Sequence, residues 1–145
     1  MGQSIILENK WMLIPLFIQF LLTMLIYQIN TSRRVRAVKE KKVQGTYFKT
    51  FEGDPPPRDV LASGQLILNL FEMPVLFFTI ALLIIIFNVN DTFQMIFSGL
   101  YVFFRLWHAY IKITNGHLVQ RAFVFTASTV FLTFMWFWFM IKVFL

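Results

Sequence analysis

Residues 66–89 read LILNLFEMPVLFFTIALLIIIFNV, a stretch in which Glu72 is the one charged side chain. About 20 apolar residues in an α-helix cross the roughly 30 Å hydrocarbon layer of a bilayer. Three further stretches meet this criterion with at most one charge each: residues 11–29, 92–111 and 122–145. The sequence therefore predicts an all-α membrane protein built from a bundle of four transmembrane helices.

The composition of the 145-residue chain agrees with this prediction. Hydrophobic residues make up 58% of the chain and charged residues 14%, whereas soluble domains carry about 25% charged residues. We expect a single membrane domain over residues 1–145. The chain has no cysteine, which excludes disulfides, thiolate metal sites and a cysteine nucleophile. It has two histidines and few carboxylates near them, so we expect no metal site.

Basic residues are concentrated in one loop, at about residues 30–65. Eight of the 13 Lys and Arg residues lie between Asn30 and Arg58. Basic loops of membrane proteins stay in the cytoplasm, so this loop is predicted to be cytoplasmic and both termini are predicted to be outside. Such a loop also attracts anionic lipids. It lacks a recognisable docking fold for nucleic acid, and no nucleic-acid partner is expected.

The connections between the spans carry turn and capping residues. Residues 88–91 predict a tight turn between antiparallel helices, and Gly116 is expected to adopt a positive φ after the third span. Residues 31–43 mix basic residues with helix formers and are expected to extend the first helix into water. Asp59, two residues after three prolines, is expected to cap the second helix, which begins before the membrane.

Two polar stripes interrupt the apolar spans. Gln65, Asn69 and Glu72 are spaced four and three residues apart and share one face of the second helix. The third span carries a second stripe, formed by Arg105, His108 and Lys112. Antiparallel helices place Glu72 and Arg105 at similar depth. We expect either a structural ion pair between them or a polar cleft that holds a charged ligand.

The segment Asn69-Leu70-Phe71-Glu72-Met73-Pro74 resembles the second-helix motif of the MAPEG superfamily, the membrane-associated proteins in eicosanoid and glutathione metabolism, and is closest to its bacterial type. The resemblance implies a homotrimer in the bacterial cytoplasmic membrane, with glutathione bound between subunits. It also implies that Glu72 receives the glutathione ammonium group and that Asn69 hydrogen-bonds its backbone. Arg121 would lie near the sulfur, Arg105 would match the family's third-helix arginine, and Arg33, Arg34 or Arg36 would match the arginines that end the first helix.

Two functions remain open. The first is a glutathione S-transferase or peroxidase that acts on lipophilic electrophiles by stabilising a bound thiolate. Its predicted catalytic residues are Arg121 and Arg34, and its predicted ligand-binding residues are Gln65, Asn69, Glu72, Arg105, His108 and Lys112. The alternative is a non-catalytic membrane protein, such as an accessory subunit of a larger membrane complex. In such a protein the polar cleft would hold a lipid headgroup, or its residues would contribute to packing between helices. Gln65 favours this alternative because glutathione-using members generally carry an arginine at that place.

Overall fold

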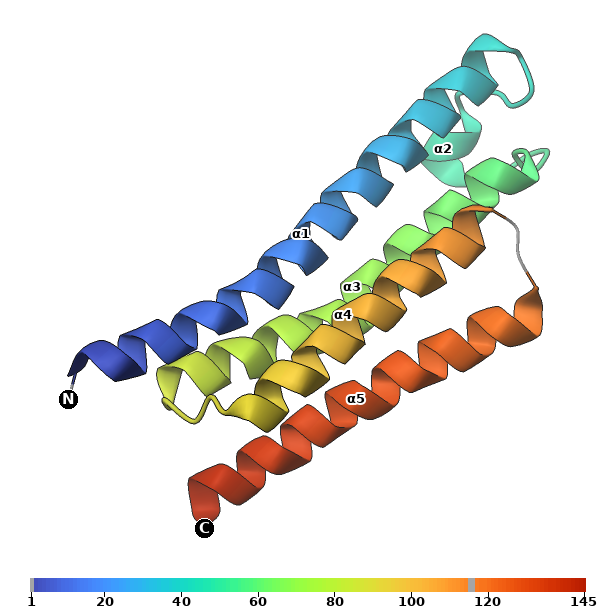
Figure 1. The fold of residues 1–145 in the computed structure, drawn as a ribbon. Coiled ribbons are helices and arrows are strands. Elements are labelled where there is room, and N and C mark those ends of the chain that lie inside the picture. Colours follow the sequence, from blue (N-terminus) through green and yellow to red (C-terminus); the bar gives the residue numbers. More distant parts are fainter. Residues whose placement is uncertain (1, 115–116) are drawn as a thin grey trace.

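The computed structural model describes residues 2–114 and 117–145, and all regular structure in these residues is helical. The elements, in chain order, are α1 (Gly2–Lys39), α2 (Tyr47–Thr50), α3 (Arg58–Ile86), α4 (Thr92–Ile113) and α5 (Leu118–Phe144). Figure 1 shows the four long helices side by side, with successive long helices running in opposite directions. We call the end that carries α2 the loop end. The opposite end, where α1 starts and α5 finishes, is the termini end.

Three of the helices are long and apolar enough to cross a membrane: Asn9–Lys39, Arg58–Ile86 and Leu118–Phe144. Helices of this length and hydropathy are typical of an integral membrane protein. The helix α4 is shorter, and its Gln94, Arg105 and His108 lower its mean hydropathy. All three of these side chains are buried against the rest of the protein. A fourth crossing by α4 therefore stays a prediction.

The core lies between α3, α4 and α5, with α1 covering one side. The largest buried cluster includes Phe77, Ile80 and Ile84 of α3 with Tyr101 of α4. The Phe77 and Tyr101 rings stack with their centroids 4.4 Å apart. The helix α4 packs most closely against α5, and α1 against α3. In the described residues α1 and α5 do not pack together, and Figure 1 shows them on opposite sides of α3 and α4.

Large apolar side chains also cover the outside of the bundle. Phe17 of α1, Leu82 of α3 and Phe137 of α5 are all more than half exposed. In water such a surface would drive aggregation, whereas lipid chains solvate it well. The exposed apolar faces therefore agree with a protein that sits in a bilayer.

In the segment 30–65, predicted as a basic loop into which the first and second helices extend, both extensions are present and α2 is an additional short helix. The helix α1 continues to Lys39, the chain forms α2 at Tyr47–Thr50, and α3 begins at Arg58. The predicted cap was wrong, because the residue before α3 is Pro57, whose φ of −51° suits a helix start. Asp59 lies in the first turn instead. The turn at residues 88–91 is confirmed, whereas Gly116 lies outside the described residues.

Candidate functional site

A basic pocket opens at the loop end, where α3 begins, α4 ends and α5 begins. Its volume is about 280 Å³. Three of its lining side chains are cationic, namely Arg58 on α3, Lys112 on α4 and Arg121 on α5. The other lining residues are Leu61, Ala62, Gln65 and Ile111. The antiparallel order of the helices brings these three cations, which are far apart in the sequence, to one place.

One cation of the basic pocket is bonded to a neutral acceptor. Lys112 Nζ donates a hydrogen bond of 2.7 Å to Gln65 Oε1. Among the residues that line the pocket there is no carboxylate. The ion pairs found in the described part of the chain, Lys42–Glu40 and Lys142–Asp91, lie elsewhere. The pocket therefore has uncompensated positive charge and suits an anionic group.

The polar stripe of α3 continues directly from this pocket. Gln65 lines the basic pocket and also begins the stripe. Gln65 and Glu72 are exposed and Asn69 is half-buried. The stripe thus lies on the outer surface of the chain, one edge of it against α4.

The predicted ion pair between Glu72 and Arg105 was wrong. Both residues are described, and their charged groups do not come within ion-pair distance. The buried face of α3 runs through Leu66, Leu70 and Pro74. At 3.6 residues per turn, Glu72 lies about 200° around the helix from Leu70 and therefore points away from the core.

Arg105 instead crosses the core to the backbone of α3. Its side chain is 1% exposed, and Nη2 donates a hydrogen bond of 2.9 Å to the carbonyl oxygen of Asn69. Its Cζ lies 5.5 Å from the centre of the Phe125 ring on α5. Arg105 thus links α3, α4 and α5 beneath the stripe. Its bond to α3 is made to the backbone of Asn69, whose side chain belongs to the stripe.

Several buried polar atoms near Arg105 have no hydrogen-bond partner among the described residues. They are Nε and Nη1 of Arg105 and Nδ1 of His108. The His108 ring lies 5.5 Å from the Phe125 ring, so Phe125 lies close to both side chains. Buried polar groups are nearly always satisfied by protein or by ordered water. These atoms mark a place for water or for polar groups of a ligand.

The two arginines predicted to be catalytic do not meet within one chain. Arg121 lines the basic pocket on α5, whereas Arg34 on α1 lies with its Cζ 5.1 Å from the centre of the Phe48 ring. Its neighbour Arg33 donates a hydrogen bond of 2.9 Å to the carbonyl oxygen of Asp59. Because α1 and α5 do not pack together in the described residues, one chain cannot bring Arg34 and Arg121 to one thiol.

Sequence reasoning missed three residues that line pockets at the loop end: Arg58, Asn30 and Phe48. Arg58 joins the basic pocket, and its position just after three prolines marked the start of a helix at the membrane edge. Asn30 is buried and its Oδ1 accepts a hydrogen bond of 3.1 Å from the Ser63 hydroxyl. Phe48 lies on the unpredicted α2, so no periodic signal pointed to it.

Comparison with known proteins gives one match. The sequence model described as the MAPEG family matches residues 10–141. This range contains the basic pocket, the stripe of α3 and Arg34. No curated protein and no solved structure matches the chain.

Proposed function

Because the chain belongs to the MAPEG family, we propose that it binds glutathione and acts as a glutathione S-transferase or peroxidase on lipophilic electrophiles. One observation carries this proposal: the uncompensated cations of the basic pocket continue directly into the exposed stripe that ends at Glu72. Glutathione has the complementary charges, with two carboxylates and one ammonium group.

The dimensions of the site suit an extended tripeptide. From Gln65 to Glu72 the helix rises by about 10 Å, and three extended residues also span about 10 Å. In the proposed pose a carboxylate of glutathione lies against Arg58 and Lys112. The ammonium group pairs with Glu72, and the peptide backbone hydrogen-bonds Asn69. The unsatisfied atoms of Arg105 and His108 support polar contacts, direct or through water, under the middle of the tripeptide.

Arg121 is the proposed catalytic residue. A guanidinium near the sulfur favours the thiolate over the thiol and so lowers the thiol pKa. The thiol proton leaves to water. In the transferase reaction the thiolate attacks an electrophilic carbon, a C–S bond forms, and the leaving group departs with its bonding electrons. In the peroxidase reaction two glutathione molecules join through a new S–S bond, and the two electrons and two protons that they give up reduce a hydroperoxide to an alcohol and water.

The proposed site is completed by a second copy of the chain. Glu72 faces outward, and Arg34 lies in a different pocket from Arg121. A neighbouring copy in a homotrimer would cover the stripe. The basic loop end would face the cytoplasm and both termini the outside, in the inner membrane of a bacterium.

A second candidate is a non-catalytic protein, such as an accessory subunit of a larger membrane complex. The bond between Lys112 and Gln65 favours it, because Gln65 offers a ligand carboxylate no permanent charge and is already engaged. In this version a lipid headgroup occupies the basic pocket, or the stripe serves packing. Copurification from native membranes in a mild detergent tests it, since a complex subunit would emerge with partner proteins.

Calorimetric titration of the detergent-solubilised protein with glutathione tests the proposed function. We expect binding to the unmodified protein and a loss of about tenfold or more in affinity for Glu72→Gln. The matched control is Glu52→Gln, an exposed carboxylate in the loop, which should leave binding unchanged. Absence of heat at millimolar glutathione, in protein shown to be folded, would contradict the proposal. Conjugation of a chlorodinitrobenzene then tests catalysis, with Arg121→Gln as the impaired variant.

A further inference from the structure

A second, larger pocket lies at the loop end on the other side of the molecule, and we call it the α1–α2 pocket. Its volume is about 630 Å³. It is bounded by the last turns of α1, by α2 and by the start of α3. It shares no lining residue with the basic pocket.

Most of the wall of this pocket is apolar. Val35 and Val38 of α1, Phe48 of α2 and Ile67 of α3 line it, together with the ring of Tyr27. Tyr27 is 52% exposed and Val35 49% exposed. A molecule bound in the pocket would therefore bury apolar surface of both side chains. Apolar side chains that line an open cavity at a membrane surface suit an acyl chain.

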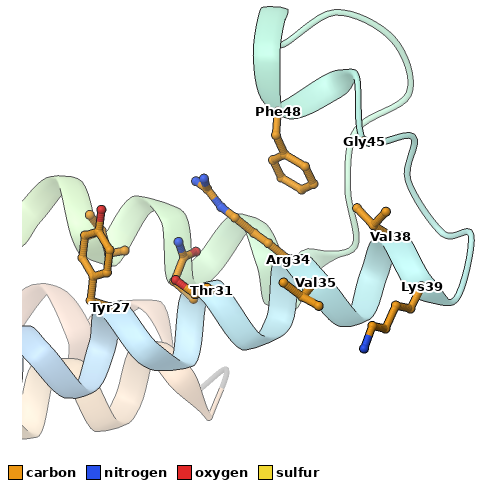
Figure 2. Close-up of a pocket in the computed structure, with 10 residues that line it drawn as sticks. Tyr27, Thr31, Arg34, Val35, Val38, Lys39, Gly45 and Phe48 are labelled. Carbon is orange, nitrogen blue, oxygen red and sulfur yellow. The ribbon is translucent and has the colours of Figure 1, made fainter.

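One cation stands within this apolar wall. Figure 2 shows the Arg34 side chain of α1 and the Phe48 ring of α2 approaching each other across the pocket. The Arg34 Nε is buried and has no hydrogen-bond partner in the described residues. The residues that line the pocket include no carboxylate. A guanidinium with unused donors, fixed over an aromatic ring, is suited to phosphate.

The order of residues along α1 matches the order of groups in a lipid. Tyr27 lies within the predicted span of 11–29, and Arg34 and Lys39 follow it toward the basic loop. From Tyr27 to Lys39 the helix rises by about 18 Å. The pocket thus passes from an apolar end at membrane depth to a cationic end at the membrane surface.

We propose that the α1–α2 pocket binds an anionic glycerophospholipid of the surrounding membrane. Its phosphate accepts hydrogen bonds from Arg34, and Lys39 adds positive charge at the rim. One acyl chain lies along Val35, Tyr27 and Ile67 toward the hydrocarbon layer. This inference does not rest on the proposed use of glutathione, because the two pockets lie apart and use different cations.

Native mass spectrometry of the full chain in an uncharged detergent tests the proposal. We expect retention of added phosphatidylglycerol and much weaker retention of phosphatidylcholine with the same acyl chains. Arg34→Gln should weaken phosphatidylglycerol retention by about tenfold or more. The matched control is Arg36→Gln, which removes the same charge from an exposed residue of α1 outside the pocket lining. This control matters because every cation near the surface attracts anionic lipid to some degree.

A second variant fills the pocket without changing its charge. A Cβ on Gly45 would lie 3.9 Å from Val38 Cγ1, an ordinary contact, and Gly45 is not among the residues with positive φ. Gly45→Leu should therefore fold and lose phosphatidylglycerol, whereas Gly45→Ala should keep it. Thermal melting of each variant shows whether it is folded. Should Arg34→Gln fail to fold, the two Gly45 variants decide the question.

Four results would overturn the proposal. Equal losses in Arg34→Gln and Arg36→Gln would show attraction to surface charge in general. Equal retention of phosphatidylcholine and phosphatidylglycerol would show an apolar site without phosphate recognition. Displacement of the lipid by millimolar inorganic phosphate alone would show an anion site that takes free phosphate. Retention of phosphatidylglycerol in Gly45→Leu would exclude this pocket as the place of binding.

Discussion

The two ends of the bundle differ in whether their charged side chains are paired. At the termini end one acid, Asp91, is surrounded by donors: its carboxylate accepts hydrogen bonds from the Gln94 backbone N–H at 3.0 Å and from Trp138 Nε1 at 2.8 Å. Lys142 Nζ adds an ion pair at 3.2 Å. At the loop end three cations, Arg58, Lys112 and Arg121, line one pocket without a carboxylate among its lining residues, and Lys112 donates to the neutral oxygen of Gln65.

This difference separates a structural cluster from a binding site. The Asp91 cluster caps α4 and ties it to α5, and its charges are balanced within the chain. The basic pocket leaves its charges unbalanced, which opposes folding and favours an anionic ligand. We therefore expect substitutions at the termini end to change stability, and substitutions at the loop end to change binding.

The largest expected effect on stability comes from Asp91→Ala. It removes the cap of α4 together with the bonds to Trp138 and Lys142, and we expect a loss of about 2–4 kcal/mol in the free energy of unfolding. The measurement is denaturant or thermal unfolding in detergent, with Asp54→Ala as an exposed control. Equal stability of the two variants would show that the Asp91 cluster does not hold the helices together.

The pH dependence of stability gives a second test of the same end. Burial raises the pKa of Asp91, but the hydrogen bonds from Gln94, Trp138 and Lys142 together bring it below its ordinary value. A lowered pKa stabilises the folded state above the unfolded pKa of about 4, and this stabilisation is lost as the pH falls through the folded pKa. Thermal unfolding between pH 6 and pH 3 should therefore show a steeper loss for the unmodified protein than for Asp91→Asn. Parallel pH profiles would show that other carboxylates control acid stability.

A smaller effect of opposite sign is expected at the loop end. Lys112→Met removes one of three like charges and leaves Gln65 exposed to solvent, so stability without ligand should stay the same or rise by about 0.5 kcal/mol. Glutathione affinity should fall in the same variant. A loss of stability comparable to that of Asp91→Ala would mean that the basic pocket is a structural cluster as well.

The smallest effect on stability is expected for Glu72→Gln. Glu72 is exposed and unpaired with Arg105 in this chain, so the change should stay within about 0.5 kcal/mol in ligand-free protein. A buried pair between Glu72 and Arg105 would instead predict a loss of about 3–5 kcal/mol. Unfolding of Glu72→Gln beside the unmodified protein distinguishes these two outcomes.

Helix positions could be predicted from the sequence because long apolar runs have few alternatives. The predicted spans 66–89 and 122–145 fall within three residues of the observed helix ends on their termini side, and the long run ending near Ile29 became α1. The loop-end extensions of α1 and α3 are polar, and both were predicted from helix-forming or capping residues, although α1 ends at Lys39 and not at Val43.

Helix faces were harder to predict, for a reason specific to membranes. In a soluble helix the apolar stripe marks the buried face. In α3 the outward residues Leu68, Phe71 and Val75 are as apolar as the buried Leu66 and Leu70, because lipid replaces water outside. Because charge is costly in lipid, the polar stripe that contains Glu72 was expected to face the interior of the bundle. In the structure of one chain it faces outward. The same reasoning succeeded for α4, whose Arg105 and His108 are buried.

The separation of α1 from α5 has a consequence for association between copies. These helices form two different flanks of the bundle, on either side of α3 and α4. Two copies that meet flank to flank through α1 of one and α5 of the other associate head to tail, and each end of the pair keeps an unoccupied flank. Further copies can then add at the unoccupied flanks until the copies close into a ring. Since the bilayer keeps the bundle axes roughly parallel, the angle between the two flanks alone sets how many copies that ring contains.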